Sequence, residues 1–396
     1  MIRRRKKTPE RTVPHTRLQS DAELTRLYRF ESKLGEGTYG VVYRATQLQT
    51  QTLWALKEIH KPEPGHSRWN LLDNEIQILQ KVDHPNIVLL SEVLHTAQKM
   101  YLVLELCSGG DLKQLLQMRI FLTEHETRAI VQALADVLLY LHRRDIAHRD
   151  LKLENILLKN PVEDDRSPIV IKVADFGLAL QCEGGLASIG TFITQACGTH
   201  TYMAPEVMSG RGYSQSCDMW SLGVIMYLLL CGQAPFEASS KSRRLEKMKR
   251  GVEFPQTLWA SVSHTAQTVL PSLLSPDPVQ RITAFQMLQS PWITGDFSRP
   301  LPPDFQERVS EKHEGSVSPD SSPREHKPHS PVCSQNEAEN GVCQKLMKKY
   351  QSEALSPKTQ SPPDVAKPSS KRKMSTVRKK RNSGPKNTVS VETSRS

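Results

Sequence analysis

The apolar residues near the start of the chain recur in short runs that are separated by turn-forming residues. Runs rich in β-branched and aromatic residues, the pattern of short strands, cover residues 40–43, 53–56 and 100–104. Between the second and third runs, Leu72, Ile76 and Leu79 fall at helical spacing. The pattern predicts a small antiparallel sheet that is interrupted by one helix over residues 69–82.

The pattern changes to long helical stretches after Gly109 and Gly110. Residues 124–142 place aliphatic side chains on one face, and residues 217–231 are apolar nearly all round, so the second helix is expected to be buried. After Trp292 the composition shifts to Ser, Pro, Lys and Glu with few aromatic residues. Such a segment cannot bury enough apolar surface to offset the loss of chain entropy on folding.

These patterns divide the chain into three parts. We expect an α+β fold with two lobes over residues 28–292. A sheet lobe over about 28–104 precedes a mainly helical lobe over about 108–292. The flanking segments, residues 1–27 and 293–396, are expected to be disordered tails, and no internal repeat is visible.

Composition and cysteine spacing restrict the class of protein. The chain has 396 residues, of which 37% are apolar, so a large domain can bury a core. Its longest uncharged apolar stretch, residues 222–231, is too short to cross a bilayer, and no apolar run follows the basic N-terminus. The 7 cysteines are scattered, which suggests neither a disulfide framework nor a zinc site. We therefore expect a protein of the cytoplasm, with the nucleus as a second location.

The net charge is unevenly distributed along the chain. Lys and Arg outnumber Asp and Glu by 53 to 42. Residues 1–27 carry 8 basic and 3 acidic residues, residues 297–396 carry 19 and 11, and residues 28–296 carry 26 and 28. The basicity therefore belongs to the tails and does not indicate a nucleic-acid-binding core.

A glycine-rich string occupies residues 35–42 and reads Gly-Glu-Gly-Thr-Tyr-Gly-Val-Val. The missing β-carbons of glycine let backbone N–H groups come close to phosphate oxygens, although an isolated string of this kind is more often only a turn. Its position strengthens the interpretation, because Lys57 follows Gly40 by 17 residues on a predicted strand. Glu75, in the following helix, can reach inward to pair with Lys57. A solvated lysine and a plain surface carboxylate are the alternatives.

Three ordered strings farther along carry groups suited to phosphoryl transfer. Residues 148–155 read His-Arg-Asp-Leu-Lys-Leu-Glu-Asn, residues 175–177 read Asp-Phe-Gly, and residues 204–206 read Ala-Pro-Glu. An Asp that can accept a hydroxyl proton, a Lys, an Asn and a second Asp form the set that holds a nucleotide's metal ions and positions an acceptor. A turn rich in capping residues would explain Asp150 and Asn155 singly, but not the lysine between them.

Together these strings resemble the catalytic loop, the metal-binding loop and the end of the activation segment of eukaryotic protein kinases. The resemblance extends over residues 28–292. The strings at residues 227–232, 235–236 and 290–292 are most similar to the calcium/calmodulin-dependent group of serine/threonine kinases. The resemblance implies the bilobal protein-kinase fold, the use of ATP and Mg²⁺, and transfer of the γ-phosphoryl group to Ser or Thr hydroxyls of protein substrates.

The resemblance also implies roles for individual residues. Asp150 would be the catalytic base and Lys152 would neutralise the γ-phosphate, while Asn155 and Asp175 would hold the Mg²⁺ ions. Leu104 would be the gatekeeper beside the backbone groups that hydrogen-bond adenine. The residues expected to bind ATP are Leu34, Gly35, Glu36, Gly37, Thr38, Tyr39, Gly40, Val41, Val42, Ala55, Lys57, Glu75, Glu105, Cys107 and Asp111.

Five further residues match structural positions of the family. Asp218, at the start of the predicted buried helix, resembles the carboxylate that anchors the backbone of the catalytic loop. Arg281 resembles the partner of Glu206, and a buried ion pair of this kind is weak evidence for stability in itself. His148 and Phe176 resemble packing residues.

Two carboxylates are expected to set the preference for protein substrates. Asp111 and Glu154 lie where acidic residues of related kinases meet a substrate arginine a few residues before the acceptor, and a charge-assisted pair there favours basic sequences. Where some relatives carry another carboxylate, this chain has Leu228. We therefore expect one upstream arginine and an apolar position. Lys152 favours Ser and Thr over Tyr acceptors.

The chain departs from the family pattern before the Ala-Pro-Glu string. Gln195 stands where many relatives carry an activating phosphothreonine, and glutamine cannot be phosphorylated. Arg149 would bind an activating phosphate, so either Thr194 or Thr191 supplies it or the segment orders without one. His200 replaces a proline that is common in the family.

The C-terminal segment carries two basic clusters, at residues 371–373 and 378–381. They match a bipartite nuclear import signal for importin or a phosphate-binding arm, and a solubilising charge run is an equal alternative. Serines that precede proline indicate a proline-directed upstream kinase; they are Ser318, Ser322, Ser330, Ser356 and Ser361. Val342, Leu346 and Tyr350 fit a calmodulin-binding or autoinhibitory helix, although a transient solvated helix explains them more simply.

Two other classes of function are compatible with parts of the sequence. A catalytically silent scaffold would use the kinase fold only for binding. The loss of a site residue usually marks such proteins, whereas Lys57, Asp150, Asn155 and Asp175 are all present here. A nucleic-acid-binding protein acting through the tails would show strongly salt-dependent binding that disappears when both tails are removed.

Overall fold

The computed structural model describes residues 12–37, 40–61, 68–164, 167–181, 200–210 and 214–295, all of which belong to one compact unit. Thr191, Thr194 and Gln195 lie outside these residues, as do the basic clusters and the Ser-Pro sites of the C-terminal segment. Within the described ranges, no helix is both long and apolar enough to cross a bilayer.

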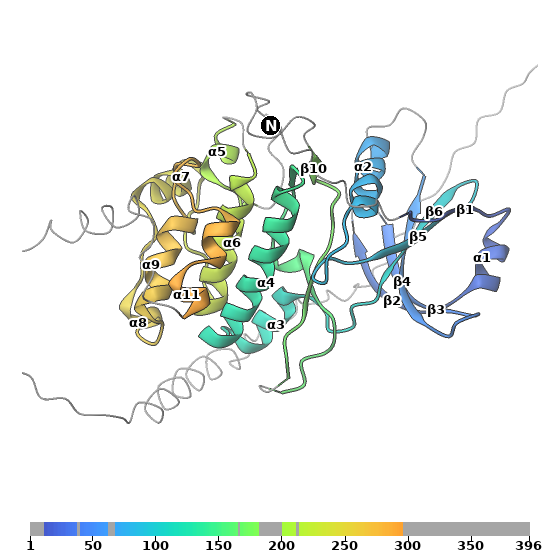
Figure 1. The fold of residues 1–396 in the computed structure, drawn as a ribbon, viewed down its shortest axis with the longest axis horizontal. Coiled ribbons are helices and arrows are strands. Elements are labelled where there is room, and N and C mark those ends of the chain that lie inside the picture. Colours follow the sequence, from blue (N-terminus) through green and yellow to red (C-terminus); the bar gives the residue numbers. More distant parts are fainter. Residues whose placement is uncertain are drawn as a thin grey trace, which may run out of the picture. The chain divides into compact units, whose positions relative to one another are not determined.

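A six-stranded sheet forms the N-terminal part of the described chain (Figure 1). Its strands are β1 (His15–Arg17), β2 (Tyr28–Gly37), β3 (Gly40–Gln47), β4 (Leu53–His60), β5 (Leu90–His95) and β6 (Lys99–Glu105). They lie in the order β1-β5-β6-β4-β3-β2. Every neighbouring pair is antiparallel except β1 and β5, which are parallel. The predicted antiparallel sheet is present, with one parallel strand added at its edge.

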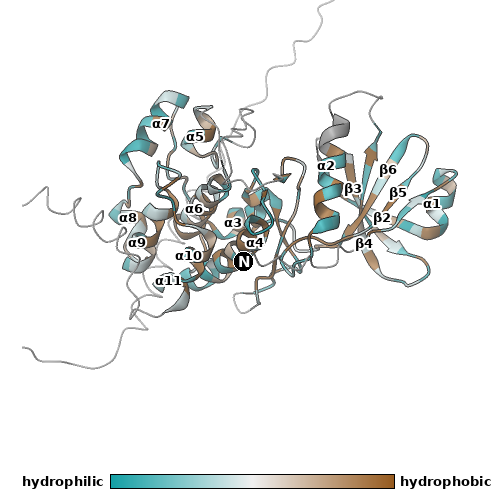
Figure 2. Ribbon diagram, turned by 45° about the horizontal axis from the view of Figure 1, so that its top comes forward, coloured by the Kyte–Doolittle hydropathy of each residue, from teal (hydrophilic) through white to brown (hydrophobic). Residues whose placement is uncertain are grey.

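Helix α2 (Arg68–Lys81) packs against this sheet, close to the bounds that the sequence predicts. Its Leu72, Ile76 and Leu79 are buried in the same hydrophobic cluster as residues of β4, β5 and β6. In Figure 2 the helix carries both brown and teal residues, as expected of a helix with one apolar face. Glu75 lies next to Ile76 and is only 3% exposed, so its carboxylate is directed toward the sheet.

The segment before the second strand corrects a prediction. The sequence predicts disorder over residues 1–27, but residues 12–27 contain β1 and helix α1 (Asp21–Leu27). Leu18 and Leu24 are buried with residues of the sheet in a second hydrophobic cluster. The pattern misses this segment because both elements are shorter than the window over which hydrophobic periodicity can be recognised.

The second part of the described chain is mainly helical, so the predicted α+β class is confirmed. Its helices are α3 (Leu112–Arg119), α4 (Glu124–His142), α5 (Pro205–Met208), α6 (Ser216–Cys231), α7 (Lys241–Arg250), α8 (Gln256–Trp259), α9 (His264–Leu273), α10 (Ala284–Leu288) and α11 (Pro291–Thr294). A capping box between Thr123 and Glu126 starts α4. Helix α6 is buried almost all round, as its apolar sequence predicts.

Two short strand pairs hold the loops that carry the predicted chemistry. β7 (Ile146–Ala147) pairs with β10 (Leu180–Gln181), and β8 (Ile156–Leu158) pairs with β9 (Ile171–Val173). The string at residues 148–155 lies between β7 and β8 and ends in the 3-10 helix η1 (Leu153–Asn155). The Asp-Phe-Gly string lies between β9 and β10. The pairings therefore bring together two strings that are distant in sequence.

Candidate active site

Asp150 lies within a group of polar side chains in the loop between β7 and β8. Its Oδ2 accepts hydrogen bonds from Lys152 Nζ at 2.6 Å and from Asn155 Nδ2 at 3.1 Å. The same Nδ2 donates to the carbonyl oxygen of Asp150 at 2.8 Å. The amide nitrogen of Asn155 thus faces Asp150, and its amide oxygen faces away. The structure brings three of the predicted site residues within hydrogen-bond distance.

A buried carboxylate on α6 holds this loop. Asp218 is fully buried, and its oxygens accept the N–H groups of His148 at 3.0 Å and Arg149 at 2.8 Å. Burial raises the pKa of Asp218, but the hydrogen bond from His142 at 3.0 Å, the charges of His142 and His148 and the N–H of Arg149 together outweigh it and hold the pKa below its usual value. Arg149 has a φ of 70°, a conformation that is costly outside glycine. The expected contact between Asp218 and the loop backbone is therefore present, and it helps to hold this strained residue.

Asp175 lies beside the same loop, because Ala174 N–H donates to the carbonyl oxygen of Asn155 at 2.9 Å. Its φ of 61° is also in the left-handed region. The next residue, Phe176, is fully buried, and its ring centroid lies 4.9 Å from that of His148. The packing of these two rings, as the family resemblance implies, fixes the backbone on which Asp175 stands.

The donor atoms at this place fit a Mg²⁺ ion. Mg²⁺ takes oxygen ligands and keeps water molecules and substrate phosphates in the rest of its octahedral shell. Asp175 offers a carboxylate, and Asn155 offers the amide oxygen that its own hydrogen bonds turn away from Asp150. One carboxylate and one amide oxygen form the kind of donor set that holds an ion shared with a nucleotide.

Lys57 on β4 and Glu75 on α2 form a largely buried ion pair. The Lys57 Nζ atom lies 2.7 Å and 3.0 Å from the two carboxylate oxygens, and the side chains are 14% and 4% exposed. Val42 of β3 is the partner of Lys57 across the sheet, so the lysine lies near the glycine-rich turn. The pair fixes the direction of the lysine and requires α2 to lie close to the sheet.

The glycine-rich turn joins β2 to β3, and its Thr38 and Tyr39 lie outside the described residues. A Cβ atom at Gly40 would lie 1.8 Å from the backbone oxygen of Glu58. Only glycine therefore lets β3 pass β4 at this point. The other predicted ATP contacts of the sheet are Leu34, Gly35, Glu36 and Gly37 on β2, Val41 and Val42 on β3, and Ala55 on β4.

Glu105 lies at the connection between the sheet and the helical part. Its N–H donates to the carbonyl oxygen of Leu89 at 2.8 Å, and its own carbonyl oxygen lies 4.0 Å from Cys107 Sγ. Its carboxylate lies 2.8 Å from the Nζ atoms of both Lys159 and Lys172. Burial raises the pKa of Glu105, but the two lysines outweigh it and hold the pKa below its usual value. Sequence reasoning missed these lysines because only the β8–β9 hairpin brings them to Glu105.

Cys107 gives a test of where ATP binds. Burial, together with the nearby charge of Glu105, raises the pKa of its thiol to about 11. Since only the thiolate reacts, roughly one thiol in a thousand is reactive at pH 8, and alkylation by iodoacetamide should accelerate about tenfold for each pH unit up to about pH 10. We expect Mg-ATP to slow this reaction several-fold, as measured by peptide mass spectrometry.

Cys231 is the matched control for that experiment. Burial raises the pKa of its thiol to about 11 as well, but it lies at the end of α6. Its alkylation should not depend on ATP. Alkylation of Cys107 at the same rate with and without a saturating concentration of ATP would contradict the placement of adenine beside it.

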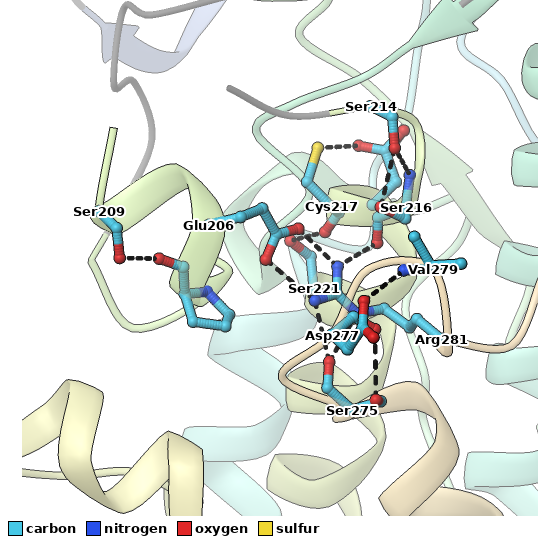
Figure 3. Close-up of polar contacts among 12 residues, drawn as sticks. Glu206, Ser209, Ser214, Ser216, Cys217, Ser221, Ser275, Asp277, Val279 and Arg281 are labelled. Carbon is cyan, nitrogen blue, oxygen red and sulfur yellow. Dashed lines mark hydrogen bonds and ion pairs between the residues drawn. The ribbon is translucent and has the colours of Figure 1, made fainter. Parts of the chain in front are cut away.

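Glu206, the last residue of the Ala-Pro-Glu string, forms a buried ion pair (Figure 3). Arg281 donates from Nη1 and Nη2 to the two carboxylate oxygens of Glu206 at 2.7 Å and 3.0 Å. The same guanidinium donates to the backbone carbonyl oxygens of Ser216 and Ser275. Both members of the pair are buried. The expected pairing is present, and it ties α5 to the start of α6 and to the loop after α9.

The two carboxylates expected to meet a substrate arginine both have partners within the chain. Asp111 caps α3 by accepting from the backbone and side-chain amides of Gln114 at 2.9 Å and 3.0 Å. Glu154 pairs with Lys113 at 2.8 Å. Burial raises the pKa of Glu154, but Lys113, a backbone hydrogen bond and the charge of Lys152 together hold it below its usual value. The sequence did not predict the pairing of Lys113 with Glu154, since the two residues are 41 positions apart. A substrate arginine has to compete with these contacts.

Comparisons with known proteins agree with this site. Residues 28–293 match the family model described as protein kinase domain. The chain is 45% identical over 290 residues to serine/threonine-protein kinase 33 of Bos taurus and 45% identical over 287 residues to that of Mus musculus. The alignments cover 72% of this chain in both cases, and 59% and 58% of the relatives, so the chain spans less than two thirds of their length.

A further relative is matched over nearly its whole length. Myosin light chain kinase A of Dictyostelium discoideum is 38% identical over 279 residues, which is 70% of this chain and 91% of that protein. The strings at residues 99–107, 150–156 and 292–295 predict a likeness to serine/threonine-protein kinase 33, and the comparison confirms it. Both the geometry of the site and the matched family model thus lead to one conclusion: the chain belongs to the protein kinase family.

Proposed function

We propose that this protein is a serine/threonine protein kinase, which transfers the γ-phosphoryl group of ATP to Ser or Thr hydroxyls of protein substrates. The observation that carries the proposal is that Lys152 and Asn155 both lie within hydrogen-bond distance of the Asp150 carboxylate. Asp175 lies beside them, and Lys57 is already oriented by its ion pair with α2. These are the positions at which phosphoryl transfer needs a base, cations and metal ligands.

Each group has a chemical task in this reaction. Asp150 accepts the proton of the substrate hydroxyl as that oxygen bonds to the γ-phosphorus and the bond to the ADP oxygen breaks. Lys152 adds positive charge next to the developing negative charge. Lys57 binds the phosphates that become part of ADP. Mg²⁺, held by Asn155 and Asp175, neutralises phosphate charge when it is bound.

A catalytically silent scaffold with the same fold is the alternative. A scaffold needs no oriented base, whereas three backbone and side-chain contacts hold Asp150 and its loop in place here. It also needs no buried lysine–carboxylate pair between β4 and α2. These features favour the enzyme. Binding of ATP without any transfer of phosphate would identify the protein as a scaffold.

The type of acceptor residue is tested by acid hydrolysis of a phosphorylated protein substrate. We expect phosphoserine and phosphothreonine and no phosphotyrosine, because Lys152 lies beside the catalytic base in the arrangement typical of Ser/Thr kinases. Phosphotyrosine as the main product would contradict this part of the proposal.

Glu154 and Lys113 give a second testable prediction, on substrate sequence. A peptide with an arginine upstream of the serine should have a kcat/KM about two- to fivefold higher than its alanine analogue, because the ion pair that forms is partly exposed and has to displace Lys113. Glu154→Gln should abolish this difference. Lys113→Ala should enlarge it, since the carboxylate then has no competing cation.

The controls for this prediction use the alanine peptide, whose kcat/KM should change little in either variant. A peptide array that shows an acidic or proline-directed preference would contradict it. So would a Lys113→Ala variant with a reduced preference for arginine.

For the tails we propose a role in binding other proteins and no role in catalysis. The clusters at residues 371–373 and 378–381 support binding to importin and a nuclear as well as cytoplasmic location. The Ser-Pro sites support modification by proline-directed kinases. Neutralising both clusters in a fluorescently tagged chain should remove it from the nucleus, and an unchanged distribution would contradict the import signal.

A further inference from the structure

Residues 12–27, here called the N-terminal segment, lie outside the part of the chain that the kinase family model matches. The segment nevertheless belongs to the folded sheet. Strand β1 runs parallel to β5, with His15 opposite Val93. Val93 N–H donates to the carbonyl oxygen of Pro14 at 2.9 Å, and Leu18 N–H donates to that of His95 at 2.7 Å. Figure 1 shows β1 at the edge of the sheet beside β5.

The segment contributes to both hydrophobic clusters of the sheet. Val13 is 6% exposed and belongs to the cluster that contains the apolar face of α2. Leu18 and Leu24 are buried in the other cluster, with Leu94 of β5 and Tyr101 of β6. The segment thus contributes buried side chains to both clusters, and the Val13 end lies in the cluster that contains α2.

His15 adds a polar contact to the same helix. Its Nε2 atom is hydrogen-bonded to the side-chain amide of Gln80 on α2. Its Nδ1 atom lies 3.3 Å from His95 Nε2, and the two rings stack with centroids 5.4 Å apart. His15 therefore bridges β5 and the C-terminal end of the helix that carries Glu75.

Helix α2 is also connected to the loop that follows the Asp-Phe-Gly string. Asn74 Nδ2 donates to the carbonyl oxygen of Ala179 at 2.6 Å, and Lys81 Nζ donates to Gln181 Oε1 at 3.0 Å. An outward movement of α2 would break these bonds together with the Lys57–Glu75 pair. Contacts that hold α2 inward therefore favour the arrangement in which the whole site is assembled.

We infer that the N-terminal segment is a positioning element for the active site, which holds α2 in the place where Glu75 pairs with Lys57. This inference rests on the proposed kinase function. His15 contacts the helix directly through Gln80, and Val13 shares the hydrophobic cluster of α2, whereas Leu18 and Leu24 lie in the other cluster. Neither Val13 nor His15 is a predicted substrate contact, so both act by setting the population of the competent arrangement of α2.

The test uses point variants of the full-length chain. Val13→Asp and His15→Ala should each weaken the hold on α2, and we expect kcat to fall about tenfold in Val13→Asp and less in His15→Ala, with KM for the peptide little changed. Amide hydrogen exchange along residues 68–81 should accelerate in both variants. Gln80→Ala should lower kcat as His15→Ala does, and the double variant should cost no more than either single variant.

Leu18→Ala is the matched control, because it removes buried apolar surface from the same segment but on the face away from α2. It should lower the melting temperature while leaving kcat and the exchange of α2 close to wild type. Loss of kcat in proportion to lost stability in all variants, Leu18→Ala included, would overturn the inference. Unchanged exchange of α2 in Val13→Asp would also overturn it. Hydrogen exchange needs no substrate, so the inference stays testable even if the protein transfers no phosphate.

Discussion

Replacing Asp150 with asparagine is expected to lower kcat for peptide phosphorylation by about 10²- to 10⁴-fold, the usual contribution of a positioned general base. Asparagine keeps the size of the side chain and can still accept the hydrogen bond from Lys152, which lies 2.6 Å away. It cannot take up the proton of the substrate hydroxyl. Single-turnover transfer from labelled ATP measures the chemical step apart from product release.

ATP affinity separates this effect from a general loss of structure. Asp150 is not a predicted ligand of the nucleotide or its metal ions, so the Kd of Mg-ATP should stay within about twofold of wild type. Glu163→Gln, the same change of carboxylate to amide in an exposed loop, should leave both quantities unaltered. Transfer by Asp150→Asn at a rate close to wild type would show that the proton leaves by another route.

Replacing Arg281 with alanine is expected to lower the free energy of unfolding by about 3–5 kcal/mol. The substitution leaves the carboxylate of Glu206, which is 6% exposed, without its partner inside the protein, and also removes the donor to the carbonyl oxygens of Ser216 and Ser275. An uncompensated buried charge costs more than the intact pair gains. Urea unfolding followed by tryptophan fluorescence measures the change.

Two further variants show whether burial is the cause. Lys33→Ala breaks the exposed ion pair with Glu36, whose side chains are 50% and 64% exposed, and should lower the free energy of unfolding far less than Arg281→Ala does. Replacing Glu206 and Arg281 together with methionine should recover much of the loss, because no charge is then left unpaired. Equal destabilisation by Arg281→Ala and Lys33→Ala would contradict this explanation.

The sequence was most informative where local pattern decides the structure. Helix α4 has the predicted bounds because its apolar face and its capping box are both local signals. The groups around Asp150 could be named because they lie within one short string. Asp218 and Arg281 could be assigned only through the family resemblance, since nothing in periodicity or spacing connects them to residues far away in the chain.

The features that were missed depend on tertiary contacts. The lysines that hold Glu105 are brought to it by the β8–β9 hairpin, and the partner of Glu154 comes from α3. The order of residues 12–27 depends on β5, which lies about 75 residues farther along the chain and supplies the edge for β1. An element as short as β1 has little tendency to form a strand by itself and is stabilised by pairing with the rest of the sheet.

The central claim is tested most directly by incubating the intact chain with Mg-ATP labelled at the γ-phosphate and a basic serine peptide, with ATP binding measured on the same preparation. We expect label on the peptide serine, and at least about a hundredfold slower labelling when Asp150→Asn replaces the intact chain, although ATP still binds. ATP binding by the intact chain without any transfer to peptide or protein acceptors would contradict the account and favour a scaffold.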